Sequence, residues 1–187
     1  MNENLGAYGE FTNSREVRLV RILPGSIERV WAFLTDSEKR GTWLAAGHMD
    51  LQVGGHVHLS FDHAALSPHE VRPEEHKGCR GGDQYEGVIT QCEPPNLLSF
   101  TWDGSEVTFE LASLGDETRM VLTHRHLTNT EESISVAAGW HVHVAYLIAR
   151  LTGLEPPPFW ATHARLEQDY TTRLAAGFPP PTSDVKN

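Results

Sequence analysis

The chain has 187 residues and a formal net charge of −10 at pH 7. This length suits a single domain whose core is large enough to fold without disulfides. The negative charge argues against binding to nucleic acid or to anionic membranes, because both need a basic surface on the protein.

The expected location is the cytoplasm. The first residues, MNENLGAYGEF, contain no basic region followed by an apolar stretch, and no long run of apolar residues occurs further on. Such a sequence predicts neither a secretion signal nor a membrane-spanning helix. Cys79 and Cys92 are therefore expected to be free thiols, since the cytosol keeps thiols reduced.

The first 23 residues predict an arm and a strand. Residues 1–14 are polar and show no sustained period, so we expect a flexible arm. Residues 15–23 alternate charged and apolar side chains, which predicts a half-buried strand with Val20 and Ile22 on one face. Pro24-Gly25 ends this strand.

Two short helices are predicted next. Ser26 can cap an amphipathic helix whose apolar positions are Ile27, Val30, Trp31 and Leu34. Asp36 can cap a second helical piece that ends near Gly41. Trp43-Leu44 then forms an apolar plug that closes this segment.

A meander of strands follows. Residues 56–61 alternate strictly after the turn at Gly54-Gly55, whereas residues 62–83 break every period and predict a long loop, usually functional or mobile. Four more strands are predicted at residues 85–92, 97–102, 107–111 and 118–127, separated by turn residues. Alternation places on their inner face Ile89, Leu98, Phe100, Trp102, Val107, Phe109, Leu111, Met120, Leu122 and His124.

A long helix is predicted for residues 134–154, with Thr128 or Thr130 as its cap. Its apolar stripe consists of Trp140, Val144, Leu147, Ile148, Leu151 and Leu154. This stripe must be covered, and the economical arrangement lays the helix against a curved antiparallel sheet. A run of prolines then interrupts helicity, so residues 155–176 form a helical extension and residues 177–187 a disordered tail.

The helical extension at residues 155–176 contains more apolar residues than are needed to fill the groove of one domain. Its helix begins near Phe159 and places on one side Trp160, His163, Glu167, Tyr170 and Leu174. We therefore predict that this helix supports a homodimer.

Short stretches between residues 15 and 154 follow one another in a recognisable order. They are Val30-Trp31 with Leu34-Thr35-Asp36, Trp43-Leu44, Gly54-Gly55, Gly87 and Ile89 before Glu93-Pro94, Thr101-Trp102, Thr118 with Thr123-His124, and Gly139-Trp140 with Leu147 and Leu151. Together they resemble the activator of heat shock protein 90 ATPase homologue-like family, within the START-like (SRPBCC, helix-grip) superfamily. The resemblance implies an α+β helix-grip fold over residues 15–154. In this fold a curved antiparallel sheet of six to seven strands wraps around a long C-terminal helix, and two short helices follow the first strand.

The resemblance also implies a cavity between the long helix and the sheet that binds an apolar or amphipathic small molecule. Members of the superfamily include lipid carriers, hormone receptors, aromatase/cyclase enzymes and chaperone co-factors, so the fold does not choose a function. Small-molecule binding is our first hypothesis. A cyclase- or hydrolase-type enzyme that uses the same cavity is the second, with Tyr85, Arg21 and His124 as candidate groups. A chaperone-interaction module that uses an exposed sheet surface is the third.

We predict the residues that contact a ligand from the inward-facing positions of the strands and from the apolar stripe of the long helix. They are Trp43, Phe61, Tyr85, Ile89, Phe100, Trp102, Phe109, Leu122, His124, Trp140, His143 and Leu147. His124 shares parity with Met120 and Leu122, so we expect a neutral imidazole in an apolar cavity, with its pKa lowered by burial. It would donate one hydrogen bond to a ligand and accept another, with His143 as its possible partner across the cavity.

Eleven histidines raise the question of a metal site. Residues i and i+2 share a face of a strand, so His56/His58 and His124/His126 could each present two imidazoles, whereas His141/His143 on a helix would diverge. His76 and Cys79 form an HxxC pair in the long loop. No acidic residue accompanies these histidines at a recognisable spacing, and we therefore expect neither a metal nor a cofactor.

Overall fold

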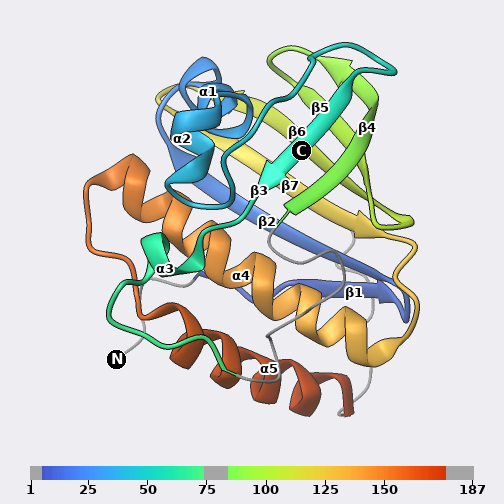
Figure 1. Ribbon diagram of the computed structural model, residues 1–187, viewed down its shortest axis with the longest axis vertical. Coiled ribbons are helices and arrows are strands. Elements are labelled where there is room, and N and C mark those ends of the chain that lie inside the picture. The colour runs from blue at the N-terminus through green and yellow to red at the C-terminus, as the bar shows by residue number, and fades with distance from the viewer. Residues whose placement is uncertain (1–5, 74–83, 176–187) are drawn as a thin grey trace.

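The computed structural model describes residues 6–73 and 84–175. Its sheet has seven antiparallel strands in the order β1-β2-β7-β6-β5-β4-β3, so β3 to β7 form a meander, and the chain crosses from β2 to the far edge of the sheet to begin β3. This confirms the predicted α+β class and the curved sheet (Figure 1). The strands are β1 (Glu10–Asn13), β2 (Glu16–Pro24), β3 (His56–Ser60), β4 (Gln84–Glu93), β5 (Leu97–Trp102), β6 (Ser105–Leu114) and β7 (Glu117–Arg125).

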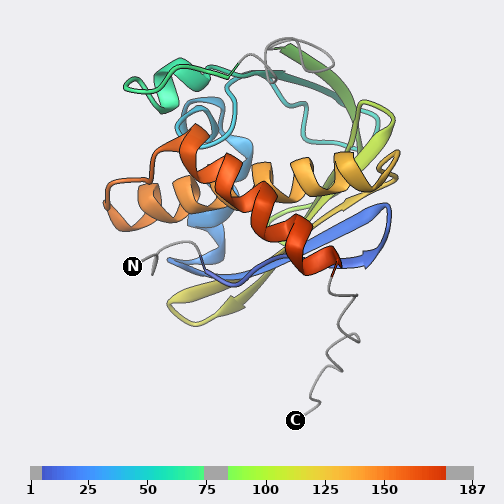
Figure 2. The same ribbon diagram turned by 90° about the horizontal axis from the view of Figure 1, so that it is seen from below.

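The helices lie on the concave side of this sheet and at its end. They are α1 (Ile27–Thr35), α2 (Ser37–Gly41), α3 (His63–Leu66), α4 (Thr130–Thr152) and α5 (Phe159–Ala175). As predicted, Ser26 and Asp36 cap α1 and α2 through their side chains. Figures 1 and 2 show α4 between the sheet and α5, so the long helix is covered on two sides.

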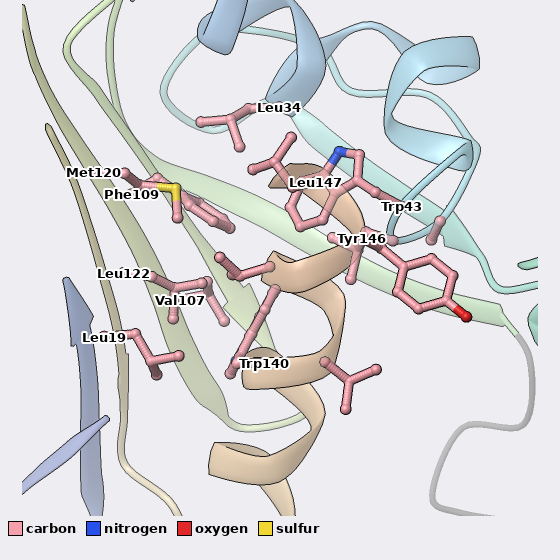
Figure 3. Packing of buried hydrophobic residues seen from close by; sticks show 14 of the residues in the cluster. Leu19, Leu34, Trp43, Val107, Phe109, Met120, Leu122, Trp140, Tyr146 and Leu147 are labelled. Carbon is pink, nitrogen blue, oxygen red and sulfur yellow. The ribbon is translucent and has the colours of Figure 1, made fainter. Parts of the chain in front are cut away.

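The main core lies between α4 and the inner face of the sheet. In β6 and β7, Phe109 is paired with Leu122 and Val107 with His124, and all four side chains are buried. Figure 3 shows Phe109 and Leu122 facing Trp140 and Leu147 of α4 across this core. The alternation read from the sequence therefore predicted the inner face of both strands.

The ends of α4 differ from the prediction. The helix begins at Thr130, and its cap is Asn129, whose side-chain oxygen accepts a hydrogen bond from Glu132 N at 2.9 Å. Thr128 does not cap the helix because its hydroxyl is bound to the Glu132 carboxylate. The helix ends at Thr152 ahead of Gly153, which has a left-handed φ of 75° that favours glycine. Leu154 therefore lies outside the helix and is 52% exposed.

The structure also decides which face of β2 points toward the core. Val17, Leu19, Arg21 and Leu23 are buried, whereas Ile22 is 48% exposed. The register with β7 pairs Leu19 with Leu122, which fixes this parity toward the core. Both the odd and the even positions of residues 15–23 include apolar side chains. The odd positions point inward, but Arg21 is one of them and makes that face look less apolar. Val20 and Ile22 do share a face, as predicted, but it is the outer one, and the sequence pattern did not decide which face is inner.

Part of the expected flexible arm is ordered. Residues 10–13 form β1 on the sheet edge, with Phe11 opposite Val17. Tyr8 Oη donates to Asp169 Oδ2 at 2.7 Å, and Gly9 N donates to Tyr170 Oη at 2.8 Å. The groups that hold the arm come from α5, at the other end of the chain, so the local sequence could not reveal them.

The apolar residues of α5 are used within the chain. Phe159, Trp160, His163 and Tyr170 are buried in this single copy. Leu166 is also buried, whereas Leu174, which we expected on this side, is only partly covered. The homodimer remains a prediction, and the residues on which it rested are covered by the protein's own loop and α4.

One described helix, α4, is long and apolar enough to cross a membrane by length and composition. However, 67% of its apolar window is buried inside the protein. Burial to this extent is typical of a helix in the core of a soluble domain, and α4 lies in the core of this one. A cytoplasmic location remains a prediction, and His76, Cys79 and the tail at 177–187 lie outside the described residues.

A buried arginine organises the segment between α2 and β3. Arg40 is 1% exposed, and its guanidinium donates to the carbonyls of Thr35 at 2.9 Å and Ala45 at 3.1 Å, and also to those of Leu34 and Gly47. Burial lowers the pKa of Arg40 to about 10, which still leaves it charged at neutral pH. The side chain therefore ties the end of α1 to the loop that carries Trp43 and Leu44.

Replacing Trp140 with alanine is expected to destabilise the protein by about 3–5 kcal/mol, the usual cost of emptying a buried aromatic site. Trp140 is 4% exposed, whereas Trp31 on α1 is only partly buried. Denaturant unfolding should show a clearly smaller loss for Trp31→Ala. A loss below about 1 kcal/mol for Trp140→Ala would show that this residue is not part of the core.

Replacing Arg40 with methionine is expected to cost about 2–3 kcal/mol, because buried carbonyls lose a charged donor. The exposed neighbour Lys39 provides the matched control, and Lys39→Met should change the free energy of unfolding by no more than about 0.5 kcal/mol. Equal effects of the two substitutions would contradict the structural role assigned to Arg40.

Candidate functional site

Two adjoining hollows lie between α4 and the sheet. The inner hollow has a volume of about 140 Å³ and is mostly apolar; it is lined by Leu44, Phe61, Trp102, His124, Val136, Gly139, Trp140 and His143. The outer hollow has a volume of about 390 Å³ and is more polar; it is lined by Trp102, Asp103, Ser105, His124, Thr128, Asn129, Glu131, Glu132, Ser135 and Val136. Trp102, His124 and Val136 line both, so the two hollows meet at these residues.

The predicted ligand contacts fall into two groups. Phe61, Trp102, His124, Trp140 and His143 line the inner hollow. The second group is fully buried in the surrounding core and lines neither hollow; it comprises Trp43, Ile89, Phe100, Phe109, Leu122 and Leu147. Tyr85 lies behind the wall, where its ring stacks on Trp102 with centroids 5.0 Å apart.

The sequence analysis missed three residues that line the inner hollow and most of those that line the outer one. Leu44 was described as a plug, Gly139 was named only as part of the family resemblance, and Val136 was not singled out. A signal for two of them exists, because Val136, Gly139, Trp140 and His143 recur at i, i+3, i+4 and i+7 and so share one face of α4. A glycine and a partly buried valine at this spacing leave room beside the two large rings.

His124 on β7 is held in one tautomer by its two neighbours. Trp140 Nε1 donates to His124 Nδ1 at 3.0 Å. An indole N–H is only a donor, so Nδ1 carries no proton, and the proton of the neutral ring is on Nε2. Nε2 lies 2.6 Å from Ser105 Oγ and therefore donates to it. The Ser105 hydroxyl in turn donates to the Trp102 carbonyl.

Both nitrogens of His124 are thus used inside the protein. We expected this ring to exchange hydrogen bonds with a ligand, and the geometry differs because Trp140 and Ser105 occupy both positions. His124 presents the body of its ring to the hollows instead. Its inward orientation, inferred from strand parity, agrees with its 3% exposure.

The candidate catalytic groups are not brought together. Tyr85 accepts a hydrogen bond from the Asp103 backbone N–H, and Arg21 is buried on β2, where it lines neither hollow. Ser105 and His124 do form a pair, but a general base for Ser105 would need an unprotonated Nε2. Trp140 also occupies the side of the ring where a serine triad has its carboxylate.

His143 on α4 has the opposite tautomer. Its Nδ1 lies 2.8 Å from the Trp43 carbonyl oxygen, which only accepts, so Nδ1 carries the proton. The Trp140 ring contacts both histidines, with centroid distances of 6.2 Å to His124 and 6.4 Å to His143. His143 therefore joins the α2–β3 loop to the wall of the inner hollow.

Aromatic rings from α3, α5 and the start of the long loop close the site behind His143. The His143 ring lies 4.9 Å from Phe159, 5.8 Å from His63 and 6.3 Å from Phe61, measured between centroids. His63 also packs 5.0 Å from Trp160. The first turn of α5 therefore packs behind His143, which is part of the wall of the inner hollow.

Glu70 fixes the start of α5. Its two carboxylate oxygens accept from the backbone N–H groups of Trp160 and Ala161, each at 3.0 Å, and Ser67 Oγ donates at 2.7 Å. Burial raises the pKa of Glu70, but these hydrogen bonds outweigh it and lower the pKa overall. A carboxylate at a helix N-terminus also matches the helix dipole. The loop that seemed unstructured thus positions the helix that packs behind His143.

Burial controls the charge of the two histidines. It lowers the pKa of His124 to about 4, with Glu132 opposing the shift. It lowers the pKa of His143 to about 3; the nearby His63 adds to the shift, and the hydrogen bond to Trp43 opposes it. Both rings are therefore neutral at pH 7. Within the described parts of the chain, no three His, Cys, Asp or Glu side chains converge in a way that suits a metal ion.

A seven-stranded antiparallel sheet curved around a long C-terminal helix, with two short helices after an early strand, defines a helix-grip domain of the START-like (SRPBCC) superfamily. The family model of Activator of Hsp90 ATPase homolog 1-like proteins matches residues 24–152, more than half of the chain. The chain belongs to this family, as the resemblance predicted. The match ends before α5, whose first residue, Phe159, packs against His143 behind the inner hollow.

Solved structures give the same architecture. A protein from Bordetella parapertussis is 41% identical over 90% of this chain and 91% of its own, with a TM-score of 0.76. CalU16 from Micromonospora echinospora is 22% identical over 89% of this chain and 94% of its own, with a TM-score of 0.62. DynU16, from the dynemicin biosynthetic locus, is 20% identical over 77% of this chain and 49% of its own, with a TM-score of 0.59. The last two share the fold alone. No functionally curated protein matches the chain.

The stability of the protein should depend on the charge of His124. Because its folded pKa of about 4 lies below the unfolded value of about 6.5, the unfolded chain binds more protons between these values. The stabilising effect of the neutral ring is complete above pH 6.5 and is lost as the pH falls toward 4. Between pH 7 and pH 4 the wild type should lose on the order of 3 kcal/mol more than His124→Gln.

Glutamine is the matched variant because its amide can accept from Trp140 and donate to Ser105 without titrating. Denaturant unfolding of both proteins at several pH values measures the difference, and the effects of all other groups, including His143, cancel in the comparison. Parallel pH profiles would show that His124 is not buried as a neutral ring.

Proposed function

We propose that this protein binds an amphipathic small molecule, with an apolar, ring-sized part in the inner hollow and a more polar part in the outer hollow. The observation that carries the proposal is the junction of the two hollows at Trp102, His124 and Val136. An apolar pocket joined to a polar mouth is the usual form of a ligand site.

The volumes restrict the size of the ligand. A cavity of about 150 Å³ accommodates a benzene-sized molecule, and the inner hollow has about 140 Å³. Sites for larger ligands measure about 300–1,000 Å³. A ligand larger than one ring would therefore extend past Val136 into the outer hollow.

The charge of the outer hollow restricts the polar part. Asp103, Glu131 and Glu132 contribute carboxylates, and none of the described residues that line it is a lysine or an arginine. An anionic group there would meet like charge without a compensating cation. A neutral or cationic polar part is therefore favoured, in keeping with the net charge of −10.

The alternative of a hydrolase-type enzyme has less support. Its best observation is the contact of 2.6 Å between Ser105 Oγ and His124 Nε2. The bond from Trp140 puts the proton of the neutral ring on Nε2, so the ring is poorly placed to accept the serine proton. We therefore assign this pair to the structure of the wall.

The alternative of a chaperone-interaction module rests on the family name rather than on a surface feature. The exposed apolar residues of the sheet include Ile22 on β2, Val88 on β4 and Leu114 on β6. These strands are separated in the sheet by β7 and β5, so the three side chains are not on neighbouring strands. No single apolar docking patch supports this function among the described strands.

Blocking the junction should abolish ligand binding. Val136→Trp is expected to fill the passage between the hollows, whereas Ile134→Trp, on the same helix but outside both hollows, serves as the matched control. Benzyl alcohol should raise the melting temperature of the wild type and of Ile134→Trp saturably, because a ligand that binds only the folded state stabilises it. Val136→Trp should show no saturable shift.

Native mass spectrometry of the freshly purified wild type provides a second measurement, in which a retained small molecule should be absent from Val136→Trp. If benzyl alcohol causes no saturable shift in the wild type, or the same shift in Val136→Trp, the two hollows are not the binding site.

A further inference from the structure

We infer that His143 Nε2 is the hydrogen-bond acceptor of the inner hollow and that it selects ligands whose buried ring carries a hydroxyl or N–H donor. The inference rests on the proposed binding function and adds the chemical class of the buried part. It assigns recognition to His143 rather than to His124, the histidine that strand parity had favoured.

The first step concerns the tautomer. The Trp43 carbonyl accepts from His143 Nδ1 at 2.8 Å, so the neutral ring has its lone pair on Nε2. Burial, the neighbouring His63 and the resulting low pKa, about 3, keep the ring neutral at pH 7. Nε2 is therefore a permanent acceptor under ordinary conditions.

The second step concerns the partner of Nε2. Within the described ranges 6–73 and 84–175, Nε2 of His143 has no hydrogen-bond partner, although the residue is only 7% exposed and lines the inner hollow. The Nε2 atom itself is not fully buried, and since His143 lines the inner hollow, a ligand donor placed there can reach it. His124 differs, because both of its nitrogens are occupied by Trp140 and Ser105.

The third step concerns the rest of the lining. Leu44, Phe61, Trp102, Val136 and Trp140 offer apolar surface to the inner hollow, and the indole N–H of Trp140 is already bound to His124. Among the described residues that line the inner hollow, His143 therefore offers the one side-chain acceptor suited to a buried hydroxyl. The described part of this lining also contains no lysine or arginine that would favour a carboxylate. A phenol-like ring meets these conditions, with its hydroxyl directed to His143.

Phenol and toluene distinguish this inference from simple apolar binding, because they have nearly the same shape and differ in the hydroxyl group. A purely apolar cavity disfavours phenol, since its hydroxyl would be buried without a partner. Titration calorimetry, supported by thermal shift, should show that the wild type binds phenol at least as tightly as toluene. In His143→Phe the affinity for phenol should fall roughly tenfold or more, while that for toluene changes little.

Two further variants control the test. His143→Asn retains a donor at the position of Nδ1 for the Trp43 carbonyl but lacks the Nε2 acceptor, so it should show the same loss if His143→Phe does not fold. His56→Phe makes the same chemical change at an exposed position on β3 and should retain the preference of the wild type.

The outcomes separate the two proposals. If neither phenol nor toluene binds the wild type, the proposed binding function fails, and this inference fails with it. If toluene binds and phenol is rejected, or if His143→Asn retains the preference for phenol, the assignment of His143 is wrong while binding in the hollow stands.

Discussion

The attachment of α4 to the sheet through Trp140 is the interaction on which the rest of the structure depends. Its ring packs against Trp102 at 5.5 Å and Phe109 at 5.7 Å, and its N–H is bound to His124 on β7. Packing holds the helix close to the sheet, and the hydrogen bond fixes its rotation, because a buried indole N–H needs a partner. The same bond also decides the tautomer of His124 and, through it, the orientation of Ser105.

The two hollows lie beside this attachment, towards the N-terminal end of α4. Towards the C-terminal end, Val144, Leu147 and Leu151 are buried. Figure 3 shows Leu147 beside Leu34 of α1. Towards the N-terminal end, Val136 and Gly139 are too small to fill the space, and the two hollows open there. Phe61 after β3 lines the inner hollow, and the first turn of α5 packs behind His143, with Glu70 holding the helix start in place. The size of the residues on α4 thus sets the shape of the hollows, and contacts between segments far apart in the sequence hold their walls in place.

Two histidines in one hollow have different chemical roles because their neighbours differ. The Trp140 donor at Nδ1 and Ser105 at Nε2 occupy both nitrogens of His124. The Trp43 carbonyl at Nδ1 of His143 leaves its Nε2 as an acceptor that no described residue uses. Membership of the Activator of Hsp90 ATPase homolog 1-like family does not distinguish these cases, since the fold accommodates many functions. Whether a histidine at this site can bind a ligand depends on the hydrogen-bond partners of its two nitrogens, which a family match does not describe.

The sequence by itself determined the fold class, the strands of the meander, the caps of α1 and α2 and the inward face of His124, because each follows from local period or local hydrogen bonding. It left the face of β2 ambiguous, since Arg21 is buried among apolar positions. Only the tertiary structure decided the role of the arm, of Glu70 and of His143. Their partners are Asp169 and Tyr170, Trp160 and Ala161, and Trp43, all far away along the chain. A periodic pattern shows which side of an element is buried, but the identity of a long-range partner, and hence which polar atom stays available for a ligand, is settled only when the elements pack.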